Sequence, residues 1–147
     1  VHAGGKTAKM IKTAREVNTY KTEWAIEKIK NAVSNWKLEN SNSSQPITNY
    51  QSPITQREPK VAVMGLAFKP DIDDLRESPA LYIARRLKAD GLDILAVEPN
   101  IESHNEFKIV DYKEALEKAD IITFLVAHKE FKKLNIKTDL DFCGVIN

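Results

Sequence analysis

The residues best suited to chemistry lie in one loop, from Gly65 to Ala80, which joins a short apolar segment to a helix start. Lys69 offers a mobile ammonium and Arg76 a planar fork of donors, and both groups bind phosphate oxygens well. The helix that follows adds the positive end of its dipole, so the loop predicts an anion site. The alternative is that both cations only neutralise neighbouring carboxylates, and the spacing fits either interpretation.

Three acidic residues of the same loop, Asp71, Asp73 and Asp74, form a pattern that can bind a hard divalent cation through carboxylate oxygens. Acidic groups just before a helix are also favoured by its dipole, and they can orient the neighbouring cations. We favour the second interpretation and expect no metal site. A signalling domain with an acidic pocket stays open as an alternative, and magnesium binding would support it.

The other reactive side chains are isolated in the sequence. His2, His104 and His128 lie far from each other and from any carboxylate at ligand spacing, so we expect no catalytic residue and no triad. Cys143 follows a predicted buried strand, where a lone cysteine is typically a small hydrophobe. Glu98 follows another predicted strand, where a carboxylate can accept from a ribose hydroxyl or simply be solvated.

The elements that position these residues are short apolar runs alternating with helical patterns. Strands are predicted at residues 60–65, 93–97, 121–127 and 138–141, and helices at 79–90 and 112–118 with a short turn at 129–133. The first and third strands are apolar nearly throughout, which is typical of parallel strands covered on both faces. The sequence therefore predicts an α/β, Rossmann-like fold with a mostly parallel sheet and helices on both faces.

Local signals mark the boundaries of the first helix after the loop. Ser78 fits the N-cap, Pro79 the first helical position and Gly91 the C-terminal end. The turn before this helix has only Gly65 and lacks the Gly-x-Gly-x-x-Gly pattern, so a pyrophosphate cannot lie against bare backbone there. Side chains must then bind the anion.

A long amphipathic helix is predicted before this domain, over residues 7–36, with a break near residues 18–22. Its apolar stripe includes Trp24 and Trp36 and needs a partner, which could be missing sequence, another subunit or the following domain. Residues 37–58 are rich in Asn, Ser and Pro, and we interpret them as a linker.

Composition limits the classes of protein to consider. The chain has 147 residues, 42% of them hydrophobic, which suffices for the core of one soluble domain with an appendage. Its net charge of +1 favours neither nucleic acid nor an anionic membrane as a partner. One cysteine and no apolar run of about 20 residues indicate a cytoplasmic protein. The start at Val1, without methionine, suggests part of a longer protein.

Two segments of the loop resemble a known family. Residues 65–70, Gly-Leu-Ala-Phe-Lys-Pro, and 73–80, Asp-Asp-Leu-Arg-Glu-Ser-Pro-Ala, are similar to the signature that opens the C-terminal domain of the UDP-glucose/GDP-mannose dehydrogenase family. The form resembles the branch that oxidises UDP-N-acetyl-D-mannosamine. Residues 12–18, 97–100 and the Asp141 to Val145 region agree in order and spacing.

The resemblance implies a cytoplasmic enzyme that oxidises the C6 alcohol of a UDP-sugar to a carboxylate, in two hydride transfers to two NAD molecules, for surface polysaccharide synthesis. Residues 1–36 would be the end of a central helical domain that forms a homodimer. Residues 37–58 would be a linker, and 59–147 a C-terminal UDP-sugar-binding domain that is truncated. Phe68 and Lys69 match positions that contact the substrate's nucleotide, and Arg76 a position that reaches NAD.

The same resemblance implies that this chain is a C-terminal fragment and is inactive alone. The family's glycine-rich NAD loop, catalytic lysine and nucleophilic cysteine precede the part that this chain resembles. Cys143 lies where relatives have a basic residue, and Asn147 lies near a substrate-binding arginine of the similar branch. The rival interpretation is a non-catalytic nucleotide-binding or interaction module on a Rossmann-like scaffold.

Overall fold

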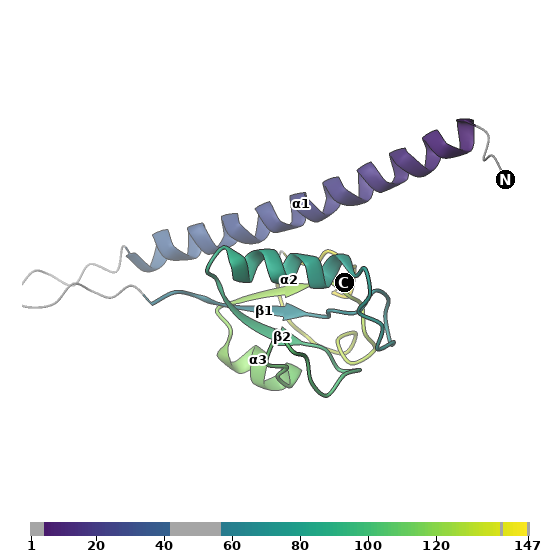
Figure 1. Cartoon of the computed structure of the whole chain (residues 1–147). Helices are drawn as coiled ribbons and strands as arrows, with labels where there is room; N and C mark the ends of the chain where they lie inside the picture. The colour runs from purple at the N-terminus through teal and green to yellow at the C-terminus, as the bar shows by residue number, and fades with distance from the viewer. Residues whose placement is uncertain (1–4, 42–56, 139, 147) are drawn as a thin grey trace, which may run out of the picture.

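A computed structural model of the chain describes residues 5–41, 57–138 and 140–146. Figure 1 shows a long helix lying along one side of a small α/β domain. The helices are α1 (Gly5–Ser41), α2 (Pro79–Ala89) and α3 (Tyr112–Lys118), and the strands are β1 (Lys60–Met64), β2 (Asp93–Val97) and β3 (Ile121–Phe124). None of the helices in the described ranges is long and apolar enough to cross a bilayer.

The strands form a parallel sheet in the order β2-β1-β3, which confirms the expected Rossmann-like fold. The chain moves from β1 to β2 in one direction and from β2 past β1 to β3 in the other. Right-handed crossovers then put the two connecting helices on opposite faces, as Figure 1 shows for α2 and α3. The β1 and β3 connections diverge at their carboxyl ends, which is where such sheets bind ligands.

Side chains of β1 alternate between two cores because successive residues of a strand point to opposite faces. Val61 and Val63 pack in the core beneath α1 and α2. Ala62 and Met64 pack on the other face, together with Ala115 of α3. All four β1 side chains are fully buried, so the sheet is covered on both faces as the apolar sequence predicts.

The boundaries of α2 follow from its local sequence. The Ser78 side chain accepts a hydrogen bond from the Leu81 N–H at 3.3 Å, and Pro79 occupies the first helical position. Gly91 follows the helix at φ +86°, with its N–H donating to the Lys88 carbonyl. All three predictions of these boundaries are confirmed.

Two of the predicted strands differ from the structure by more than one residue. β3 ends at Phe124 instead of residue 127, because the chain turns there towards the loop after β1. The strand predicted at 138–141 is reduced to an isolated parallel bridge between Asp141 and Phe124, and residue 139 lies outside the described residues. The Asp141 carboxylate accepts N–H groups of the following turn, which ends the ladder after one bridge.

The predicted break in the first helix, near residues 18–22, is also wrong. α1 is continuous from Gly5 to Ser41, because Thr19 and Thr22 each return their hydroxyl to a carbonyl four residues earlier without interrupting the helix. The helix passes its expected end at Trp36 by five residues. Most of the predicted linker, residues 42–56, lies outside the described residues.

Part of the apolar stripe of α1 is covered by the domain of the same chain. Ala25, Ile26, Ile29 and Val33 are buried against α2, which presents Leu87 among other apolar side chains. Trp24 packs edge-on against Phe142, with ring centroids 5.5 Å apart. The following domain, one of the three partners considered from the sequence, therefore covers the C-terminal half of the stripe.

Polar contacts fix the same half of α1 to the domain. Lys30 pairs with Asp90 at the end of α2 at 2.8 Å, and the Tyr82 hydroxyl donates to Glu23 at 3.1 Å. Arg57 lies 5.6 Å from the ring centroid of Trp36 and makes two hydrogen bonds to Asp120 at the start of β3. The N-terminal half, with Met10 and Tyr20 more than 70% exposed, extends beyond the domain in Figure 1.

Candidate functional site

The loop between β1 and α2 begins at Gly65, which lies close to the chain after β3: a Cβ built there would be 2.6 Å from Val126 Cβ. Gly65 has φ +96°, and its N–H donates to the carbonyl of Val97, the last residue of β2, at 2.9 Å. Leu66 and Ala67 are buried, and the chain then emerges at Phe68, Lys69 and Pro70, which are exposed. The loop therefore has a buried base and an exposed tip at the carboxyl end of the sheet.

Lys69 and Phe68 form the exposed tip. The Phe68 ring is 48% exposed, and the Lys69 Nζ lies 5.7 Å from its centroid. Among the described residues, no carboxylate forms an ion pair with Lys69, so the neutralising role considered from the sequence does not describe it. The Lys69 ammonium and the Phe68 ring are both accessible, so together they can bind a ligand that joins an anionic group to a planar ring.

Arg76 behaves differently, because its guanidinium binds Asp74 through two side-chain hydrogen bonds of 3.0 and 2.9 Å. This hydrogen bonding lowers the pKa of Asp74 to about 2 and raises the pKa of Arg76. The Arg76 side chain is nevertheless 89% exposed. The neutralising interpretation thus describes Arg76 in this structure, while its exposure leaves the guanidinium accessible to a second anion.

The base of the loop is held by Glu98, which follows β2. One carboxylate oxygen, Oε2, accepts the N–H groups of Leu66 and Ala67 at 2.8 and 2.9 Å. The other, Oε1, accepts the backbone and side-chain amides of Asn100 at 3.2 and 3.1 Å. Glu98 is 2% exposed, so neither interpretation from the sequence, a ribose acceptor or a solvated carboxylate, is correct.

The side chain of His128, in the segment after β3, completes this buried network. Its Nε2 lies 3.0 Å from Glu98 Oε2, and its Nδ1 accepts the Asp71 N–H at 3.0 Å. Because Nδ1 accepts, the ring proton lies on Nε2 and is donated to Glu98. The sequence placed His128 far from any carboxylate, and this interpretation is wrong in three dimensions.

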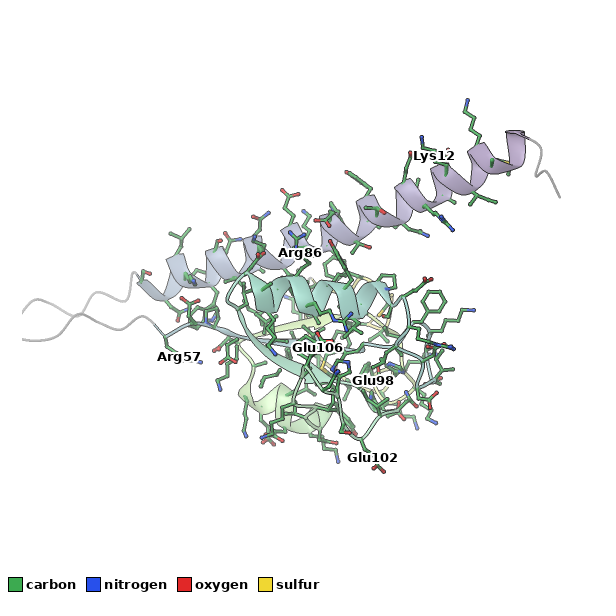
Figure 2. The ribbon with its side chains drawn as sticks, in the orientation of Figure 1. Lys12, Arg57, Arg86, Glu98, Glu102 and Glu106 are labelled. Carbon is green, nitrogen blue, oxygen red and sulfur yellow. The ribbon has the colours of Figure 1, made fainter. Side chains whose placement is uncertain are left out.

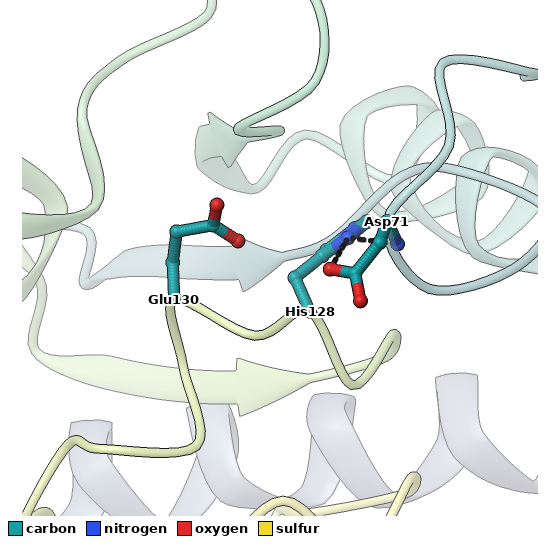
Figure 3. Close-up of side chains that lie close together, drawn as sticks. All are labelled: Asp71, His128 and Glu130. Atoms are coloured by element: carbon teal, nitrogen blue, oxygen red, sulfur yellow. Dashed lines mark hydrogen bonds and ion pairs between the residues drawn. The ribbon is translucent and has the colours of Figure 1, made fainter.

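Figure 3 shows Asp71, His128 and Glu130 close together. One possible ligand atom from each lies within 4.8 Å of the others. Asp71 Oδ1 accepts the Lys129 N–H at 2.9 Å, and both ring nitrogens of His128 already have partners. These bonds join the loop after β1 to the segment after β3. Within the described residues, no candidate metal grouping includes Asp73 or Asp74, the other members of the acidic pattern.

Cys143 lies beside the Asp141 carboxylate, which holds the turn at residues 141–146. Asp141 accepts the N–H groups of Cys143, Gly144 and Ile146, and the Cys143 thiol lies 3.4 Å from the same carboxylate. Burial, with the Asp141 charge, raises the pKa of Cys143 to about 12. The thiol is protonated at neutral pH, as expected for a structural cysteine.

Two of the hollows that border α1 lie between this helix and the domain, and neither is lined by residues of the Lys69 tip. One of about 420 Å³ is lined by Trp24, Pro79 and Phe142 among others, and one of about 480 Å³ lies between α1 and the start of α2 near Glu77 and Tyr82. They follow the seam where α1 crosses the domain. The exposed side chains of the loop, Phe68, Lys69 and Arg76, do not line either hollow.

Acid is expected to destabilise the fold because several carboxyl groups, Glu98, Asp120 and Asp141 among them, have lowered pKa values in the folded state. Burial alone would raise the pKa of Glu98, Asp120 and Asp141, but hydrogen bonds from N–H groups outweigh it and lower each pKa. Carboxyl groups of the unfolded chain titrate at about pH 4, so this stabilisation is complete above that pH and is lost as the pH falls through the folded-state pKa values.

Melting curves by circular dichroism should therefore show a nearly constant Tm from about pH 7 to about pH 5, and a falling Tm below about pH 4. Asp120→Asn removes one of the three groups and should decline less steeply than wild type. Glu102→Gln changes an exposed carboxyl and should follow wild type. Equal acid profiles for both variants would contradict the assignment of Asp120.

The domain that carries this loop matches a known protein family. The model of the UDP-glucose/GDP-mannose dehydrogenase family, UDP binding domain, matches residues 62–142, which is more than half of the chain. The chain belongs to this family. The match begins in β1 and contains the whole loop with Phe68, Lys69 and Arg76.

Relatives in the family are sugar-nucleotide dehydrogenases. UDP-N-acetyl-D-mannosamine dehydrogenase of Campylobacter jejuni is 38% identical across 97% of this chain and 32% of its own length. NDP-N-acetyl-D-galactosaminuronic acid dehydrogenase of Ralstonia solanacearum is 36% identical across 92% of this chain and 28% of its own. The chain thus spans about a third of the length of the curated relatives it matches.

Solved structures of the family share the arrangement. The native structure of UDP-N-acetyl-mannosamine dehydrogenase from Staphylococcus aureus is similar over 96% of this chain and 31% of the length of that enzyme's chain, with a TM-score of 0.66 and 26% identity. The structure of UDP-D-ManNAc dehydrogenase from Pyrococcus horikoshii is similar over 85% of this chain and 25% of the length of that enzyme's chain, with a TM-score of 0.57 and 27% identity. The similarity therefore extends beyond the sheet to much of α1.

Proposed function

We propose that this chain is the UDP-binding part of an NAD-dependent UDP-sugar 6-dehydrogenase that acts on UDP-N-acetylmannosamine. The observation that carries the proposal is the family match over residues 62–142. The named relatives support the choice of sugar. As part of the same proposal, the enzyme works in the cytoplasm as a homodimer through α1 and supplies a uronic acid for surface polysaccharide.

Phe68 and Lys69 are the proposed substrate contacts. The exposed ring can stack on the uracil, and the neighbouring ammonium can bind the diphosphate, which is the pairing that a nucleoside diphosphate requires. Both groups lie at the carboxyl end of the sheet, where α/β folds bind nucleotides. Lys69 has no carboxylate partner among the described residues, so its charge is available to phosphate.

The start of α2 does not fit the pyrophosphate of NAD. In a dinucleotide site this turn offers free backbone N–H groups, but here Glu98 takes the Leu66 and Ala67 N–H groups and no Gly-x-Gly-x-x-Gly is present. NAD, which would accept the hydride, is therefore proposed to bind mainly outside these residues. Only the exposed Arg76 guanidinium is proposed to reach it.

We further propose that this chain alone does not catalyse oxidation. The proposed oxidation needs a thiol nucleophile. The single cysteine of this chain, Cys143, has a pKa raised to about 12. A protonated thiol attacks poorly, since the thiolate is the nucleophile. The role left to this chain is to bind and orient the UDP group.

Calorimetric titration of UDP into the chain tests the proposal. Wild type should bind, and Lys69→Ala should weaken binding by roughly 10- to 100-fold, because a hydrogen bond to a charged group contributes about 1.5–3 kcal/mol. Lys113→Ala is the matched control, since Lys113 also lies over an aromatic ring, 5.9 Å from Tyr112, but on α3. It should bind UDP like wild type.

Two results would contradict this proposal. Equal affinity of wild type and Lys69→Ala would remove the role given to Lys69. No measurable binding by wild type would favour the rival function, a non-catalytic interaction module on the same scaffold.

A further inference from the structure

We infer that Glu98 and His128 are positioning residues that hold the Phe68 and Lys69 tip in the shape that binds UDP. The inference rests on the proposed function of that tip. Neither side chain is exposed, since Glu98 and His128 are both fully buried, so neither touches the substrate. They act through the backbone on either side of the tip.

The first attachment is on the N-terminal side of the tip. Glu98 Oε2 accepts the N–H groups of Leu66 and Ala67, the two residues directly before Phe68. Two bonds to one carboxylate oxygen fix the direction in which the chain leaves β1. Glu98 comes from the end of β2, so the neighbouring strand sets this direction.

The second attachment is on the C-terminal side, directly after Pro70. His128 Nδ1 accepts the Asp71 N–H at 3.0 Å, and Asp71 Oδ1 accepts the Lys129 N–H at 2.9 Å. Asp71 has φ +61°, an unfavourable backbone conformation for a residue other than glycine. Such a conformation persists only when its surroundings hold it, and the bonds from the segment after β3 do so.

The two attachments form one unit because His128 Nε2 lies 3.0 Å from Glu98 Oε2, and Asn100 contacts both side chains. Only residues 68–70 lie between the two fixed points. The bonds of Glu98 to His128 and to the two N–H groups are buried, and buried hydrogen bonds are strong and polarise each other, so they hold the unit rigid. A binding group preorganised in this way loses little freedom when the ligand binds.

The first test compares the UDP affinity of Glu98→Gln with that of Glu102→Gln. The first change replaces a buried oxygen acceptor with an amide, while the second makes the same replacement four residues later on an exposed side chain that points outward in Figure 2. UDP affinity by calorimetry should fall at least about 10-fold for Glu98→Gln and stay unchanged for Glu102→Gln. Circular dichroism at the titration temperature checks that each variant is folded.

Two changes of His128 separate the attachments. His128→Gln can keep a donor near the Nε2 position but loses the acceptor for the Asp71 N–H, whereas His128→Asn can keep that acceptor and loses the donor. Amide hydrogen exchange by NMR should then be faster at Asp71 in His128→Gln than in His128→Asn. Equal exchange at Asp71 in both variants would overturn the second attachment.

A double-mutant cycle distinguishes positioning from general stability. If Glu98 acts through the tip, Lys69→Ala should weaken UDP binding only a few-fold in the Glu98→Gln background, against roughly 10- to 100-fold in wild type. Full additivity, or wild-type affinity in Glu98→Gln, would overturn the inference while leaving the proposed function intact. No UDP binding by wild type would instead overturn the proposed function.

Discussion

Replacing Gly65 by alanine is expected to lower the free energy of unfolding by about 2–5 kcal/mol. At φ +96° an L-residue is strained, which contributes about 1–2 kcal/mol. A Cβ built at this position would also lie 2.6 Å from Val126 Cβ and 3.0 Å from Val126 N. The second contact is with backbone, so no side-chain rotation relieves it and the segment after β3 must move.

Gly91→Ala is the control for Gly65→Ala. Gly91 has a similar φ of +86°, but a Cβ there meets nothing within 4 Å. Only the conformational cost of about 1–2 kcal/mol should remain. Urea unfolding followed by circular dichroism measures both, and equal losses would contradict the close approach of Gly65 to Val126.

The second large effect is expected for Ile29→Ala in α1. Ile29 is fully buried between the helix and the domain, and its truncation should lower the free energy of unfolding by about 2–5 kcal/mol through lost burial and an unfilled cavity. The cost should be felt by α1 and the sheet domain together, since α2 packs against both. Urea unfolding curves measure it.

Ile11→Ala is the matched control because it makes the same substitution in the same helix at a side chain that is 50% exposed. It should change stability by no more than about 0.5 kcal/mol. If Ile29→Ala costs no more than Ile11→Ala, the helix does not dock on the domain in solution. The docking thus has a test that is independent of UDP binding and of any dimer.

Predictions that depended on local sequence were the accurate ones. The cap at Ser78, the proline after it and the glycine at residue 91 each act within a few residues, and all three are present. The three central strands follow from short apolar runs, since a strand buried on both faces needs no polar alternation. The break in α1 was wrong because Thr19 and Thr22 bond to carbonyls of their own helix. The strand at 138–141 was wrong because the Asp141 carboxylate starts a turn after a single bridge.

The site could be predicted only in part. Phe68, Lys69 and Arg76 are close in sequence and were identified, and their contacts with UDP and NAD stay predictions. Glu98 and His128 are 30 residues apart and follow different strands, so no spacing pattern connects them. The signal that could have found them is their shared place at the carboxyl ends of β2 and β3, the two strands that flank β1 in the sheet.

By itself, the sequence determined the loop from Gly65 to Ala80, its two cations and the parallel sheet that presents it, because short-range propensity and apolar pattern act along the chain. Tertiary structure alone decided which groups are available. It left Lys69 at an exposed tip and buried Glu98 against His128. The physical reason is that hydrogen bonding and burial depend on which strand ends meet, and this is fixed only when the sheet has formed.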